Sequence, residues 1–171
     1  MTAFLRALRL LAMVVWVGGL IFFAFVEAPT AFRVMGTNQQ FALLIGGSLD
    51  TLNGFGTTCG FVFLLSTIGL WYRTDPKGRR LLLTEALLII LMITATQIVQ
   101  RSIVPAMERD RAAAGGDINA VPIDNAARID FDRLHHLSEK VEGAVLLFGL
   151  GVVFVMAAED QRSERVPATR R

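Results

Sequence analysis

The sequence predicts an all-α integral membrane protein, a four-helix bundle with its N- and C-termini in the cytoplasm. Composition is the first observation: 53% of the 171 residues are hydrophobic and 19% are charged, below the share of about 25% that is usual in soluble domains. The second is the distribution of charge, because the charged residues gather at the chain ends and in two connections. This segregation indicates helices that cross a bilayer rather than a soluble core.

Four segments are long enough, at about 20 mostly apolar residues, to cross roughly 30 Å of hydrocarbon. We expect each segment to be a helix, because backbone polar groups cannot remain unpaired in lipid. The first segment is expected to be a retained helix rather than a cleaved signal peptide, since its apolar run is long and lacks a suitable cleavage site. Residues 1–171 form a single membrane domain, and the spans cover about residues 4–26, 51–72, 81–100 and 139–158.

The connections between the spans also carry expectations. Residues 41–49 are apolar but too short to cross the bilayer, so we expect either a surface helix or a tilted extension of the second span. Residues 101–124 are predicted to be an external loop, and residues 159–171 a cytoplasmic tail. Asp124 or Asn125 is expected to cap the fourth helix, which then stands out of the bilayer for several turns.

Lys and Arg predict the orientation of the bundle. Ten of the 17 basic residues lie at the N-terminus, in the short connection at residues 73–80 or in the tail, and seven lie on the opposite side. Cytoplasmic segments carry an excess of basic residues, so both termini are expected inside the cell. We predict a multi-pass protein of the cell membrane, with the bacterial inner membrane as its location.

Composition also bears on partners. The net charge is only +2, and the basic residues are scattered at membrane edges without interleaved aromatic residues, so no nucleic-acid partner is expected. The lipid bilayer is the predicted partner. Gly18 and Gly19, and the pair Gly56 and Gly60, give flat helix faces for close packing within the chain, in a homo-oligomer or in a membrane complex. Cys59 is the single cysteine, so no internal disulfide forms.

Polar residues of all four spans are predicted to share one level near the outer face. At 1.5 Å per residue, Glu142 lies about 24 Å from the inner end of its span, within the hydrocarbon. His135, Glu139 and Glu142 are spaced to share one helix stripe. Ionisable groups at such depth face inward or toward water. The candidate residues for binding a ligand or an ion are therefore Glu27, Arg101, His135, Glu139 and Glu142.

This polar layer has several interpretations. The leading one is a non-enzymatic protein that binds or moves a small solute or ion, with the carboxylates taking a cation and Arg101 balancing charge or anchoring an anion. In a purely structural layer, Arg101 pairs with Glu27 or Glu142. A membrane redox protein would use His135 and His136 as haem or metal ligands, although their spacing is not a strong metal signature. The remaining interpretation is a structural or accessory subunit of a membrane complex.

The sequence leaves the cofactor unknown and disfavours an enzyme. Ser138 has no base and orienting group with suitable reach, which is what a hydrolase needs. No nucleotide-binding or CxxC motif is present. The residue types of the candidate site do not identify its ligand.

Two stretches also carry a family resemblance. The stretch "WVGGLIFFAFVEAPTAF" at residues 16–32 closes the first span, and "FDRLHHLSEKVEG" at residues 131–143 opens the last. With the four spans and Pro105 after the third, they resemble the domain-of-unknown-function family 4149 of transmembrane protein 205-like proteins. The resemblance covers about residues 4–158, implies a four-helix membrane protein and assigns no activity. The residues that carry it are Trp16, Gly18, Gly19, Ala28, Pro29, Phe32, Phe131, Leu134, His135 and Ser138.

Overall fold

The computed structural model describes residues 1–36 and 39–165, and this part of the chain is helical and contains no strand. Four of its helical stretches are long and apolar enough to cross a membrane, which confirms the predicted all-α, four-span fold. The elements, with η marking a π-helical turn, are α1 (Thr2–Phe22), η1 (Phe23–Glu27), α2 (Ala28–Met35), α3 (Gln39–Trp71), α4 (Pro76–Ile98), η2 (Val99–Ile103), α5 (Val104–Ala113) and α6 (Ala126–Arg165).

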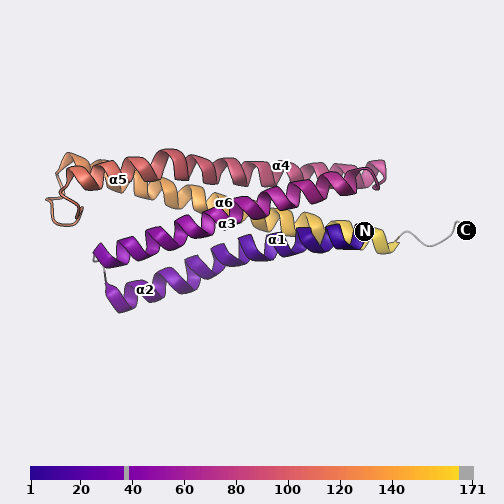
Figure 1. Ribbon diagram of the computed structural model, residues 1–171, viewed down its shortest axis with the longest axis horizontal. Coiled ribbons are helices and arrows are strands. Elements are labelled where there is room, and N and C mark those ends of the chain that lie inside the picture. The colour runs from indigo at the N-terminus through magenta and orange to yellow at the C-terminus, as the bar shows by residue number, and fades with distance from the viewer. Residues whose placement is uncertain (37–38, 166–171) are drawn as a thin grey trace, which may run out of the picture.

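The helices form an antiparallel bundle, in which α1 packs along α3 and α4 packs along both α3 and α6 (Figure 1). The N-terminus, the turn between α3 and α4 and the last turns of α6 lie at one end, called here the terminal end. The end of α2, the start of α3 and the connection between α5 and α6 lie at the other, called the loop end. The outer face of the sequence prediction corresponds to the loop end.

The helices are longer than the predicted spans. Residues 41–49 lie within α3, so they extend the second span and form no separate surface helix. The predicted external loop at residues 101–124 is helical through Ala113. A span predicted from hydropathy covers only the residues that lie in the hydrocarbon. The helix itself continues into water wherever its backbone hydrogen bonds are still formed.

The fourth helix begins and ends as follows. Asn125 is the cap expected at its start, because its Oδ1 accepts a hydrogen bond from the backbone N–H of Ala127 at 2.9 Å. At its other end, α6 continues to Arg165, well into the predicted tail at residues 159–171. Residues 166–171 of that tail lie outside the described residues.

The two π-helical turns lie in matching places, each directly before a helix that has proline in its first turn. η1 precedes Pro29, and η2 precedes Pro105. Proline lacks a backbone N–H and its ring clashes with the carbonyl of the residue four positions earlier. A wider turn accommodates this defect without breaking the helix. Both turns lie toward the loop end.

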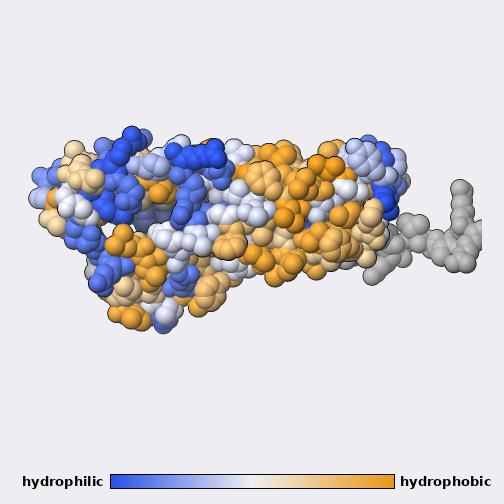
Figure 2. All heavy atoms as spheres, in the orientation of Figure 1, coloured by the Kyte–Doolittle hydropathy of each residue, from blue (hydrophilic) through white to orange (hydrophobic). Residues whose placement is uncertain are grey.

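The core fills the terminal half of the bundle. Trp16 is fully buried against Gly56 and Gly60 of α3, as the small residues predicted. Apolar side chains from α1, α3, α4 and α6 surround it. Figure 2 shows the matching outer surface, with a hydrophobic band over the terminal half, hydrophilic residues over the α5 and α6 side of the loop end, and further hydrophobic residues over α2. The buried core lies under this hydrophobic band, as expected for the part of the bundle that lies in lipid.

Candidate functional site

A partly buried glutamate, Glu142, joins α3 to α6 at the loop-end side of the core. The Nδ2 of Asn53 donates a hydrogen bond to Oε1 of Glu142 at 2.8 Å. Asn53 is 1% exposed. The second carboxylate oxygen, Oε2 of Glu142, and the amide oxygen of Asn53 are shielded from solvent and have no hydrogen-bond partner within the described residues. Two acceptor atoms are therefore left without a donor in the interior.

Further polar groups lie one helical turn deeper, from α3 and α4. The Nε2 of Gln97 donates to Oγ1 of Thr57 at 3.1 Å. Thr57 follows Asn53 by four residues, which corresponds to about 6 Å along α3. Thr96, next to Gln97, is fully buried, and its hydroxyl has no partner within the described residues. Polar groups of α3, α4 and α6 thus lie within about one helical turn of one another along α3.

The layer is closed toward the terminal end by the apolar core. Trp16, Met92 and Val145 are fully buried there, each at 0% exposure. The indole Nε1 of Trp16 is itself buried without a partner in the described part of the chain. In this conformation the core separates the Asn53–Glu142 pair from the polar groups of the terminal half.

Arg9 and Glu85 form a second buried polar pair, in the terminal half of the bundle. The guanidinium of Arg9 in α1 pairs with the carboxylate of Glu85 in α4, and the two side chains are 1% and 0% exposed. The guanidinium carbon of Arg9 also lies 4.8 Å from the ring centroid of Phe63, a cation–π contact. Sequence reasoning missed this pair, because Arg9 entered only the count of basic residues that predicts the orientation and Glu85 was not among the candidate residues.

Glu139 and His135 do not face the bundle as the predicted stripe required. Their side chains are 58% and 50% exposed, and His135 Nε2 lies 3.4 Å from Glu139 Oε1. His136 Nδ1 makes a 3.1 Å contact with the same carboxylate. The inward face of α6 is set by Phe131 and Val145, and of the three stripe residues Glu142 alone follows it.

The paired histidines also bear on the metal interpretation. Within the described ranges, no group of three or more His, Cys, Asp or Glu residues is placed to hold a metal ion. His135 and His136 make their contacts with Glu139 on the surface of α6.

Arg101 is not brought to Glu142. It lies exposed on η2, and no ion pair joins it to a carboxylate among the described residues. The wide turn of η2 buries Val99 and Ile103, and this arrangement leaves Arg101 on the outside. The expected pairing of Arg101 with Glu27 or Glu142 is therefore wrong, and Asn53 takes that place.

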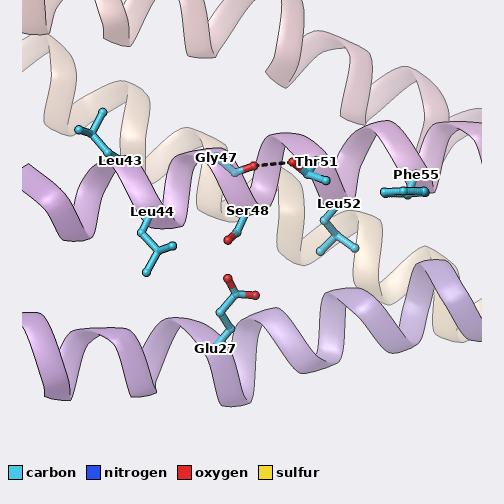
Figure 3. Close-up of a pocket in the computed structure, with 8 residues that line it drawn as sticks. All are labelled: Glu27, Leu43, Leu44, Gly47, Ser48, Thr51, Leu52 and Phe55. Carbon is cyan, nitrogen blue, oxygen red and sulfur yellow. Dashed lines mark hydrogen bonds between the residues drawn. The ribbon is translucent and has the colours of Figure 1, made fainter.

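Glu27 lines a separate groove between η1 and α3 (Figure 3). The groove has a volume of about 660 Å³ and is open to the surface. The carboxylate of Glu27 points across it toward Ser48, while Leu44 and Leu52 project into it from α3. The hydroxyl of Thr51 donates to the carbonyl of Gly47 at 2.9 Å. Glu27 and Glu142 are thus parts of two different sites, not of one.

Comparison with known proteins gives a family and no closer relative. The family described as "Domain of unknown function (DUF4149)" matches residues 11–112. No curated protein and no solved structure matches the chain. The matched region contains Asn53, Thr57 and Gln97, whereas Glu142 lies beyond it on α6.

Proposed function

We propose a function from the premise that this chain belongs to the family described as Domain of unknown function (DUF4149). The protein is a small multi-pass membrane protein that binds a small cation, or a proton, at Glu142 and Asn53. The ligand enters from the loop end. This proposal makes the solute or ion function suggested by the sequence more specific, because it names the binding residues and the charge of the ligand.

One observation carries the proposal: Oε2 of Glu142 is buried inside the bundle without a hydrogen-bond donor in the described residues. A charged carboxylate that is shielded from water and accepts only one hydrogen bond from a neutral amide is unfavourable, because that bond does not replace its hydration. It therefore takes a proton or attracts a cation. Asn53 holds the other oxygen, Oε1, at 2.8 Å and so fixes the direction in which Oε2 points.

The two oxygen atoms of the site that have no hydrogen-bond donor favour a positively charged ligand. Oε2 of Glu142 and the amide oxygen of Asn53 are both acceptors, and oxygen atoms of this kind are the ligands that hard cations prefer. A proton on Glu142 has the same effect, because it turns the carboxyl into a donor. An anion is disfavoured, since Arg101, the cation that was expected to attract it, lies exposed on η2.

The arrangement supports binding more directly than conduction. The fully buried side chains of Trp16, Met92 and Val145 close the route from the site to the terminal end. Movement of an ion across the membrane would need these helices to separate. The turns η1 and η2, which depart from regular α-helical pairing, lie toward the loop end and are the elements best suited to such a change.

Thermal stability of the purified protein, titrated with Na⁺, K⁺ or Ca²⁺ and also with pH, tests the proposal. A ligand that binds only the folded state raises the melting temperature with concentration. We expect one of these titrations to raise it in the wild type, and Glu142→Gln to remove that response. Asn53→Ala should weaken it.

The matched control is Glu139→Gln, since that side chain is 58% exposed and lies outside the site. It should respond as the wild type does. If Glu142→Gln follows the wild type in every titration, Glu142 binds neither a cation nor a proton, and the proposal is rejected.

A further inference from the structure

A second groove lies between α1 and α6, in the terminal half of the bundle and away from Glu142. It has a volume of about 520 Å³. Leu10, Val14 and Val17 of α1 form one wall, and Val153 and Met156 of α6 form the other. Such an apolar crevice on the outside of a membrane bundle faces lipid, so lipid is the molecule available to fill it.

The length of the groove matches one leaflet. On α1 it extends from Arg6 to Gly18, twelve residues or about 18 Å at 1.5 Å per residue. Half of a hydrocarbon core of roughly 30 Å is about 15 Å. An acyl chain that lies along the groove therefore reaches from the membrane surface to the middle of the bilayer.

The charge at the groove is positive at one end only. Arg6 and Arg9 line it near the terminal end, and none of the described residues that line it is acidic. Arg6 is exposed, whereas Arg9 is buried with Glu85. Basic pockets between transmembrane helices at the membrane surface attract anionic lipid headgroups. Arg6 is thus placed where the phosphate of a lipid would lie if its chain filled the groove.

We propose that this groove binds an anionic phospholipid of the leaflet at the terminal end. One acyl chain lies between α1 and α6, and the phosphate contacts Arg6. Gly18 keeps the inner part of the groove open, because a Cβ built on it meets no atom within 4 Å. A larger side chain at Gly18 therefore fills the space that the acyl chain occupies, without a clash inside the protein.

Native mass spectrometry of the detergent-solubilised protein tests this, with phosphatidylglycerol and phosphatidylcholine of identical acyl chains as probes. We expect a preference of about fivefold for phosphatidylglycerol, the factor that corresponds to about 1 kcal/mol for one arginine at an anionic surface. Arg6→Gln should bring the two lipids to equal binding. Gly18→Leu should remove the binding of both.

Gly54→Leu is the matched control, since Gly54 is also exposed, has no atom within 4 Å of a built Cβ and does not line the groove. It should bind as the wild type does. Equal binding of the two lipids by the wild type, or unchanged binding by Gly18→Leu, would overturn the proposal. Inorganic phosphate is the last probe: if it displaces phosphatidylglycerol at equal concentration, the site recognises the free anion and not a lipid.

Discussion

Arg9 and Glu85 are the most deeply buried charges of the described chain, and each depends on the other. Both lie in the apolar half of the bundle, with 1% and 0% of their side chains exposed. Replacing one partner leaves the other charge in a medium that solvates it poorly, which destabilises the folded protein. Replacing both partners with apolar residues often changes the stability little. The pair thus specifies how α1 meets α4 and contributes less to the free energy of unfolding than its charges suggest.

We predict that Arg9→Leu or Glu85→Leu alone destabilises the protein by about 3–5 kcal/mol. The double substitution should cost far less than the two single effects together. Unfolding in detergent, followed by circular dichroism, measures all three variants. Arg80→Leu is the control, because Arg80 is exposed at the same end of the bundle. Additive losses would show that the two charges are not coupled.

The candidate site was only partly predictable at this scale. Counting residues from the membrane edge placed Glu142 at the depth of polar residues from the other spans, and the structure joins it directly to Asn53 of α3. The depth of a residue in the membrane does not say how its helix is rotated, however, and therefore not whether its side chain faces the bundle. Glu139 was assigned to the inward stripe although it is 58% exposed. The Arg9–Glu85 pair joins residues 76 apart in the sequence, and predicting it required knowing that α1 and α4 lie across the bundle from each other, both packed on α3 and α6.

Among the elements, α3 shows how small residues position an aromatic anchor. Trp16 of α1 lies against Gly56 and Gly60, so that the two helices approach closely. A Cβ added at Gly60 would lie 2.8 Å from Cζ3 of Trp16 and 2.9 Å from Cδ1 of Ile93. The same helix presents Gly54 to open space. The sequence identified the glycine pair as a flat face for close packing, but could not tell a contact within the chain from a contact between chains.

We predict that Gly60→Ala lowers the free energy of unfolding by about 1–3 kcal/mol, the usual effect of overpacking a filled site. Gly54→Ala should be neutral or slightly stabilising, since alanine favours a helix and has room there. Thermal unfolding of both variants in the same detergent gives the comparison. Equal behaviour of the two would mean that α1 and α3 do not pack as described.

The lengths and π-helical turns of the elements could not be derived from hydropathy. The apolar pattern fixes where a helix lies in lipid, and α2 and α5 continue beyond it. Pro29 and Pro105 are visible in the sequence, yet a proline in a helix permits a kink, a break or a wider turn. Which of these forms is decided by the neighbouring helices.

For the whole molecule, the four spans followed from composition and charge segregation, and their even number places the start of α1 and the described end of α6 at the same end of the bundle. Their direction across the membrane stays a prediction. It rests on the cluster of basic residues at 73–80, which lies at the terminal end.

We expect a reporter fused after Arg171 to be active in the cytoplasm. A cysteine at Ala113, in a Cys59→Ser background, should react with an impermeant label added outside. Ala113 is exposed near the loop end and avoids Gly115, whose φ of +79° disfavours a side chain. The reverse pattern of labelling would invert the bundle and move the proposed site to the cytoplasmic face.

The central claim is that the buried carboxyl of Glu142 takes up a cation or a proton, and infrared difference spectroscopy observes that group directly. The measurement compares the carboxyl bands of the protein before and after addition of the cation, or a change of pH, that stabilises the wild type. We predict a carboxyl band that shifts in the wild type and in Glu139→Gln and that is absent from Glu142→Gln. An identical difference spectrum in Glu142→Gln would contradict the account, because the responding carboxyl would then belong to another residue.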